Sequence, residues 1–283
     1  MTELEVPGAV LHYDVREAPR GDRPTLLMFG SPMDASGFAD LAERFTDRTV
    51  VTYDPRGAAR SQRSVSGEST PELHADDLHR LIEALGTGPV DIFASSGGAV
   101  NALALVARHP EQVRIFVAHE PPVAQLLPDR DRALAALADI RETYERDGFG
   151  PAMAKFIALT STRGEVPADF ADRPTPDPAA FGMPTGDDGS RDDVLLAQNL
   201  ITCTHFEPDF DALRAASTRI VPAAGAESEG ELAHRGALAV AERLGTEAVT
   251  FPSHHGGFMA GGFMKGDPDG FAATLREVLD GTR

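Results

Sequence analysis

The chain has 283 residues, of which 42% are hydrophobic, and a formal net charge of −18 at pH 7. That apolar content excludes a disordered chain, and the negative charge argues against a protein that binds nucleic acid or anionic lipid, since both need a basic surface. A single cysteine, Cys203, excludes an internal disulfide framework and a multi-cysteine zinc site.

At the N-terminus, residues 1–5 lack a basic region followed by an apolar stretch, so we expect no signal peptide. No apolar run approaches the ~18 residues that a membrane span needs. We therefore expect a soluble, cytoplasmic protein that contacts neither membrane nor nucleic acid. Arginine far outnumbers lysine, and together with the abundant alanine this suggests a GC-rich bacterial genome.

Short apolar runs that end in turn residues predict strands at 25–29, 49–53, 90–93, 113–118, 219–223 and 247–251. Apolar residues at helical spacing predict helices at 38–45, 71–85, 98–108, 231–244 and 268–279. Strands that alternate with helices in this way predict an α/β fold, with a mostly parallel sheet and helices on both of its faces.

The regular alternation stops after the strand at 113–118. The following residues, 123–217, contain helical stretches around a loop at 167–193 that is rich in Pro, Gly and Asp. We predict that 1–122 and 218–283 form the core domain, and that 123–217 is a helical cap inserted into it.

A serine on a turn between a strand and a helix is the first candidate for chemistry. The segment reads D-I-F-A-S-S-G-G-A. A nucleophile on such a sharp turn needs small residues two positions to either side, because strand and helix pack tightly there. Ser96 has Ala94 and Gly98 in these positions, whereas Ser95 would have a phenylalanine. We predict Ser96 as the nucleophile and the N–H of Gly97, at the helix N-terminus, as a donor to an oxyanion.

With these features the chain resembles the α/β-hydrolase superfamily over nearly its whole length. Phe29-Gly30-Ser31-Pro32 stands where that family has its H-G-x-P oxyanion loop, although Phe29 replaces the usual His. Residues 54–61, D-P-R-G-A-A-R-S, resemble the family's D-x-R-G-x-G-x-S stretch. The resemblance implies that the N–H of Ser31 is the second oxyanion donor. In the family's numbering, the predicted cap follows the sixth strand.

Two adjacent histidines follow the last predicted strand, in the sequence P-S-H-H-G-G-F at 252–258. A serine hydroxyl is a poor nucleophile until a neighbouring imidazole takes its proton, and in this superfamily the imidazole comes from the loop after the last strand. His255 resembles the histidine of the family's P-G-x-H-x-G-F pattern, so we predict His255 as the base. His254 is the alternative.

The acid that pairs with the histidine is the residue for which this chain departs most from the family's motifs. It most often stands in a G-x-x-D turn after the seventh strand, but here that turn reads G-A-E-S and its acidic position holds Ser228. The other location in the superfamily, as in some haloalkane dehalogenases, is directly after the sixth strand, where this chain has Glu120. An acid there can orient the histidine ring and stabilise its charged form. We predict Glu120, with Glu227 as the alternative acid.

A serine nucleophile argues against dehalogenase and epoxide-hydrolase chemistry, which uses an aspartate at this position. It implies an acyl-enzyme that water hydrolyses, with no cofactor and no metal. We expect the substrate to be a small or medium apolar carboxylic ester or lactone, because the insertion is rich in apolar side chains and the chain has no Trp.

Three other readings of the pattern stay open. One is a perhydrolase, thioesterase or amidase with the same triad, and another is a non-hydrolytic lyase or cyclase of secondary metabolism. The third is a catalytically silent ligand-binding protein that retains the fold. A small-molecule substrate is the expected partner in the enzymatic readings, and a homodimer through the cap or the edge strand is a further hypothesis.

Overall fold

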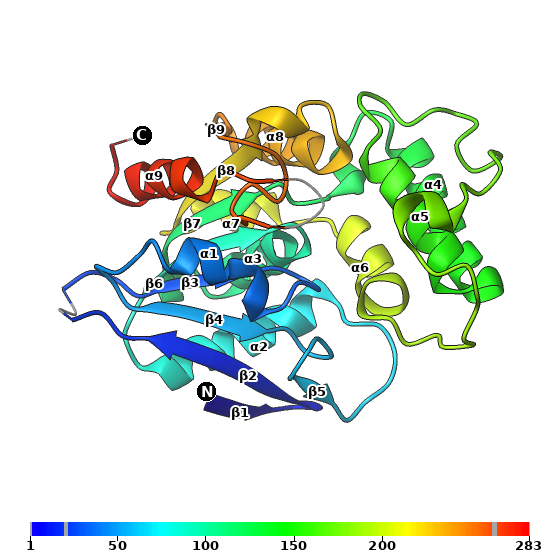
Figure 1. Cartoon of the computed structure of the whole chain (residues 1–283). Coiled ribbons are helices and arrows are strands. Elements are labelled where there is room, and N and C mark those ends of the chain that lie inside the picture. The colour runs from blue at the N-terminus through cyan, green and yellow to red at the C-terminus, as the bar shows by residue number, and fades with distance from the viewer. Residues whose placement is uncertain (1, 20–21, 262–264, 283) are drawn as a thin grey trace.

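The structure is a computed structural model that describes residues 2–19, 22–261 and 265–282 (Figure 1). Its centre is a sheet of strand order β1-β2-β4-β3-β6-β7-β8-β9, with the short β5 paired to β2. β2 pairs antiparallel with its neighbours, and all pairs from β4 to β9 are parallel, which confirms the predicted α/β fold. The strands are β1 (Thr2–Val6), β2 (Ala9–Arg16), β3 (Leu26–Phe29), β4 (Val50–Asp54), β5 (Gln62–Arg63), β6 (Val90–Ser95), β7 (Val113–His119), β8 (Arg219–Gly225) and β9 (Val249–Phe251).

The antiparallel hairpin of β1 and β2 is a difference from the sequence prediction, which starts the sheet at residue 25. β2 alternates between buried and partly exposed side chains, because one of its faces is only lightly covered. Strands β3 and β6, in contrast, are buried along their whole length; β3 is apolar throughout, and β6 is apolar except at Asp91 and Ser95. A search for apolar runs therefore finds the central strands and misses the hairpin.

Helices cover both faces of the sheet and pack into two separate hydrophobic clusters. α1 and α9 contribute to one cluster through residues such as Leu41 and Phe271. α2, α3 and α7 contribute to the other through residues such as Leu78, Leu103 and Phe210. The α-helices are α1 (Ala39–Ala42), α2 (Pro71–Leu85), α3 (Gly97–Arg108), α4 (Arg130–Asp147), α5 (Phe149–Thr160), α6 (Leu200–Thr204), α7 (Phe210–Ala215), α8 (Leu232–Leu244) and α9 (Pro268–Leu279). The short turns are the 3₁₀ helices η1 (Ala35–Phe38), η2 (Pro110–Gln112), η3 (Ala124–Leu126), η4 (Pro178–Phe181) and η6 (Ala226–Ser228), and the π-helix η5 (Val194–Asn199).

The helical ends follow the local sequence signals. The side chain of Thr70 accepts a hydrogen bond from the N–H of Leu73 and caps α2, which begins at Pro71. The same helix ends at Gly86, whose φ of 63° is a left-handed conformation that a glycine adopts without steric cost. None of the helices in the described part of the chain is long and apolar enough to cross a membrane.

Between β7 and β8 the chain forms a separate helical layer. α4 and α5 stand together beside the sheet, and α6 lies between them and the core (Figure 1). The layer has a hydrophobic cluster of its own, which includes Leu137, Ile140 and Leu200. α7 belongs to the same insertion in sequence, but its Phe210 and Leu213 pack in the cluster of the sheet and α3.

Hydrogen bonds tie the helical layer to the core on two sides. Arg235 of α8 donates to the carboxylate of Asp129, and the same carboxylate accepts the N–H of Val166 at 2.6 Å. On the other side, the carbonyl of Gln198 accepts the N–H of Ser69 at 3.1 Å. These contacts hold the layer over the carboxyl ends of the strands, where parallel sheets of this kind place their ligands.

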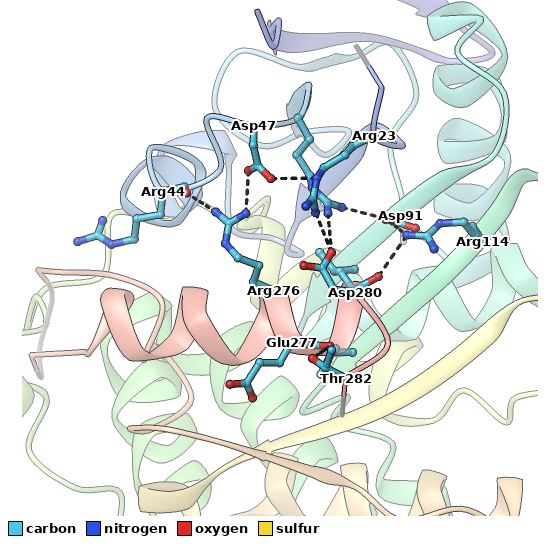
Figure 2. Close-up of polar contacts among 12 residues, drawn as sticks. Arg23, Arg44, Asp47, Asp91, Arg114, Arg276, Glu277, Asp280 and Thr282 are labelled. Atoms are coloured by element: carbon cyan, nitrogen blue, oxygen red, sulfur yellow. Dashed lines mark hydrogen bonds and ion pairs between the residues drawn. The ribbon is translucent and has the colours of Figure 1, made fainter. Parts of the chain in front are cut away.

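A network of arginine and aspartate side chains lies at the opposite end of the strands (Figure 2). Asp91, near the start of β6, accepts from Arg48 at 3.0 Å and from Arg114 of β7 at 2.5 Å. Asp280, directly after α9, accepts from Arg23 at 2.7 Å. The network therefore docks α9 against the strand starts, and it is a structural element at the edge farthest from the turn that carries the predicted nucleophile.

Two fully buried histidines make the stability of the fold depend on pH. Burial lowers the pKa of His74 and of His119 to about 4, from an ordinary value of 6.5. The unfolded chain binds protons on both groups as the pH falls below 6.5, and the folded chain does not until about pH 4. Their contribution to stability is thus complete above 6.5 and is lost as the pH falls towards 4, by up to about 3 kcal/mol for each group.

We expect the free energy of unfolding to fall between pH 6.5 and pH 4.5, and to fall less steeply in His74→Gln. His74 contributes a hydrogen bond between its Nε2 and the Oδ1 of Asn199 at 3.0 Å, which glutamine can partly replace without titrating. Urea unfolding followed by circular dichroism at several pH values measures both slopes. Equal slopes in the two proteins would contradict the assignment.

Candidate functional site

Ser96 stands on a sharp turn between β6 and α3, where the sequence predicts the nucleophile. Its φ of 57° and ψ of −131° form a strained conformation for a residue with a side chain. The turn is held by the N–H of Ser96, which donates to the carbonyl of His119 at 2.9 Å. A Cβ on Gly98 would lie 2.8 Å from the Cα of Gly30, so this flank of the serine has room only for glycine.

Ser31 and Gly97, the two predicted oxyanion donors, both line the same cavity as Ser96. A Cβ on Gly97 would lie 2.6 Å from the carbonyl oxygen of Ser31, which shows how closely the two backbone segments approach. Gly97 is the first residue of α3, and the first N–H groups of a helix have no acceptor within it. A negative charge that develops beside Ser96 would therefore meet a helix N-terminus.

Glu120 and His255 come together although 134 residues separate them in sequence. The Nδ1 of His255 lies 2.6 Å from the Oε2 of Glu120. The other oxygen, Oε1, accepts from the N–H of Gly225 at 2.8 Å and from the hydroxyl of Ser228. Glu120 is fully buried and has a φ of 48°. Its carboxylate is thus fixed by three partners, and one of them is the imidazole.

The pair shifts the titration of both groups. Burial would raise the pKa of Glu120, but the hydrogen bond from His255 and the one from Ser228 outweigh it, and this pKa lies far below its usual range. Burial would lower the pKa of His255, but the hydrogen bond and charge of Glu120 outweigh it, and this pKa is raised. The carboxyl is therefore ionised at neutral pH, and the imidazole can accept and hold a proton more readily than a free histidine.

The alternative base, His254, and the alternative acid, Glu227, make different contacts from those of His255 and Glu120. The Nδ1 of His254 accepts the N–H of Gly256 at 3.1 Å, so this ring is engaged in its own loop, although it also lines the cavity. Glu227 is exposed, and its backbone carbonyl, not its carboxylate, is contacted by Arg163. The backbone N–H of Glu227 donates to the carbonyl of Ser253 in the histidine loop at 2.9 Å, but among the described contacts only the carboxylate of Glu120 is hydrogen-bonded to His255.

A cavity of about 460 Å³ opens between the sheet and the helical layer, and Ser96 and His255 both line it. Its wall is mainly apolar and comes from both sides, with Leu137 and Phe156 from the helical layer and Phe258 and Met259 from the core among the contributing side chains. The volume lies within the range of small-molecule sites. Within the described residues, no group of three His, Cys, Asp or Glu side chains is arranged to hold a metal ion.

Two residues of the site lie outside the sequence prediction. Ser228 occupies the position where the family's acid was expected, and its hydroxyl donates to Glu120. Glu231 lines the cavity, whereas the sequence shows it only as the first residue of a helix. An acidic residue beside the G-A-E-S turn was a signal for Glu231, but several glutamates follow that turn, and spacing alone cannot separate them.

Comparisons with known proteins agree with this geometry. A family model described as alpha/beta hydrolase fold matches residues 26–203. An uncharacterized hydrolase of Bacillus subtilis (strain 168), YraK, is 34% identical over 264 residues, which cover 90% of this chain and 89% of YraK.

Among solved structures, a thermophilic esterase from Thermogutta terrifontis aligns with a TM-score of 0.69 at 20% identity, over 99% of both chains. The enol-lactonase from Burkholderia xenovorans LB400 aligns with a TM-score of 0.66 at 18% identity, over 99% of this chain and all of that one. At such identities these two structures support the fold alone. With the family match and the YraK alignment, the strained serine turn and the parallel sheet place this chain in the α/β-hydrolase family.

Proposed function

We propose that the chain is a serine hydrolase that cleaves a small or medium apolar carboxylic ester or lactone through an acyl-enzyme. Ser96 is the nucleophile, His255 the base and Glu120 the acid of this proposal. The observation that carries it is the 2.6 Å hydrogen bond between the buried Glu120 and the half-buried His255, beside a cavity that Ser96 also lines. The 34% identity to YraK, an uncharacterized hydrolase, supports the hydrolase class, and the esterase and the enol-lactonase named above have the same fold.

The proposed reaction begins when the Nε2 of His255 takes the proton of the Ser96 hydroxyl. The serine oxygen then attacks the substrate carbonyl, and the N–H groups of Ser31 and Gly97 stabilise the oxyanion. Glu120 keeps the proton of Nδ1 in place and stabilises the imidazolium. The imidazolium then protonates the leaving alcohol, and water, activated by the same histidine, releases the acid.

The substrate class follows from the wall of the cavity. Leucine, phenylalanine and methionine side chains of the helical layer and of the core line it, so an apolar acyl or alcohol group gains free energy when it enters. In this proposal residues 123–217 are the cap that covers the substrate. The hydrogen bonds that tie the helical layer to the core on its two sides fix the position of this cap over Ser96.

A fluorophosphonate probe tests the acyl-enzyme directly. We expect one adduct per chain, which peptide mass spectrometry locates on Ser96, and hydrolysis of one or more members of a panel of p-nitrophenyl esters and lactones. Protein that turns over a substrate but takes no label would overturn the proposal, and would favour a lyase or cyclase reaction in the same cavity.

The pH dependence of the reaction provides a second test. A general base must be neutral, so kcat/KM rises as the pH passes the pKa of His255. Glu120 and Glu231 raise that pKa above 6.5 against the opposing effect of burial, and the ring of His119, which is neutral at this pH, stacks on the ring of His255. We expect the midpoint of the acidic limb above pH 6.5 and a lower midpoint in Glu231→Gln. A wild-type midpoint below 6.5 would contradict this account.

A further inference from the structure

Glu231 places a carboxylate in a cavity that is otherwise mainly apolar. It precedes α8, and it is the only Asp or Glu among the described residues that line the cavity. Its side chain is 24% exposed, so most of its surface is removed from water. Its carboxylate does not cap α8, although acidic residues at such a position often do.

The charge of Glu231 is only weakly compensated by the protein. Among the residues that the structure describes, the only ion pair of Glu231 is a long one to Arg163, whose Nη2 lies 4.0 Å from Oε1. Arg163 is 64% exposed, and the same nitrogen donates to the carbonyl of Glu227 at 2.8 Å. His255 is already paired with Glu120. Burial accordingly raises the pKa of Glu231, because the ionised form lacks a close partner.

Neutral hydrogen-bonding groups surround this end of the cavity. Thr160 and Ser161, at the end of α5, line it together with Glu231. The N–H of Gly164 donates to the carbonyl of Gly230 at 2.9 Å, and this contact holds the end of α5 beside the start of α8. This part of the cavity thus lies where the helical layer contacts the core, and a substrate group bound there can contact the carboxylate of Glu231.

We propose that Glu231 selects substrates that carry a positively charged group, such as a protonated amine, and rejects those that carry a carboxylate. A cation beside Glu231 supplies the missing partner of a half-buried charge, whereas an anion there repels it in a medium less polar than water. The net charge of −18 acts in the same direction on approach. This inference rests on the proposed hydrolase function and names the substrate class of that site.

The test compares esters that differ only in the charge at the end of one chain. The p-nitrophenyl esters of ε-aminohexanoic acid, heptanoic acid and adipic acid carry an ammonium, a methyl and a carboxylate group, respectively. A second series places the same groups on the alcohol side of acetate esters. We expect the wild type to prefer the ammonium ester over the methyl ester by about tenfold in kcat/KM, in one series or the other, and to cleave the carboxylate ester most slowly.

Three variants test whether Glu231 causes the preference for the ammonium ester. In Glu231→Gln the kcat/KM for the ammonium ester divided by that for the methyl ester is expected to fall to about one. Because both values are measured in the same variant, a change in the pKa of His255 affects both esters equally and cancels. Glu229→Gln, an exposed glutamate two residues away, makes the same chemical change outside the cavity and should keep the ratio. Arg163→Ala removes the competing cation and should increase the ratio about threefold. A ratio that is the same in wild type and Glu231→Gln in both series would overturn the inference.

Calorimetry separates a failure of this inference from a failure of the proposed function. ε-Aminohexanamide and heptanamide are titrated into the wild type and into Glu231→Gln, and no catalysis is needed. The inference is supported if the wild type binds ε-aminohexanamide more tightly than heptanamide and Glu231→Gln loses this difference, even if no ester is cleaved. Equal binding of both ligands, or binding of neither, overturns it, even if every ester is cleaved.

Discussion

Ser96→Ala is expected to lower kcat for a p-nitrophenyl ester by about five orders of magnitude and to abolish fluorophosphonate labelling. The loss is this large because a nucleophile acts together with its base and acid, so that removal of one member removes the contribution of all three. The remaining activity over the uncatalysed rate comes from binding and from the two N–H donors beside the serine. Steady-state kinetics and gel fluorescence measure the two effects.

Ser95→Ala is the matched control, because it removes the same group from the neighbouring position. Ser95 lines the cavity, but its hydroxyl pairs with the buried Nδ1 of His119 at 3.0 Å. His119 is fully buried and has a pKa of about 4, and its Nε2 has no hydrogen-bond partner among the described residues, so no acid there supports it as a base. We expect Ser95→Ala to lose less than about tenfold in kcat. Lost labelling in Ser95→Ala, with labelling retained in Ser96→Ala, would reverse the assignment of the nucleophile.

The local rules of the sequence predicted the central part of the fold well. α2 and α9 begin and end where Pro71, Gly86 and Pro268 indicate, because proline and glycine act within one turn of the chain. The buried strands β3 and β6 were predicted for a similar reason, since a strand covered on both faces is apolar at most of its positions. The serine turn followed from the steric demand of its neighbours, and the structure shows that demand at Gly98.

Other features could not be predicted, because they depend on contacts between distant segments. The β1–β2 hairpin is stabilised by pairing to β4, and its alternating side chains give only a weak strand signal. The π-helix η5 ends at Asn199, whose side chain contacts His74, 125 residues away in sequence. The carboxylate of Glu231 in the cavity likewise depends on how α5 meets α8, and a linear sequence does not contain that information.

The choice of the acid is the point at which the structure adds most to the sequence prediction. The family resemblance left a choice between Glu120 and Glu227, since the usual acidic position holds Ser228. In the structure the hydroxyl of Ser228 donates to Glu120, so the residue at the usual acidic position supports an acid that comes from another strand. Gly225 donates to the same oxygen at 2.8 Å. Two fixed donors on Oε1 leave Oε2 for the imidazole.

This arrangement makes Glu120→Gln a severe change despite its small size, with an expected loss in kcat of about 10³–10⁴-fold. The donors of Gly225 and Ser228 require an acceptor, so they fix the amide oxygen in the place of Oε1 and turn the amide NH₂ towards His255. The Nδ1 of His255 then accepts a hydrogen bond, and its proton must reside on Nε2. In that tautomer the ring cannot take the proton of Ser96.

Glu227→Gln, which changes an exposed carboxylate in the same turn, is the control and should stay within about twofold of wild type. Kinetics with one p-nitrophenyl ester compare the two variants, and thermal unfolding confirms that both are folded at the assay temperature. A large loss in Glu227→Gln with little loss in Glu120→Gln would show that the acid of the reaction comes from the turn after β8. The 2.6 Å contact between Glu120 and His255 would then be a structural ion pair that holds the histidine loop in place.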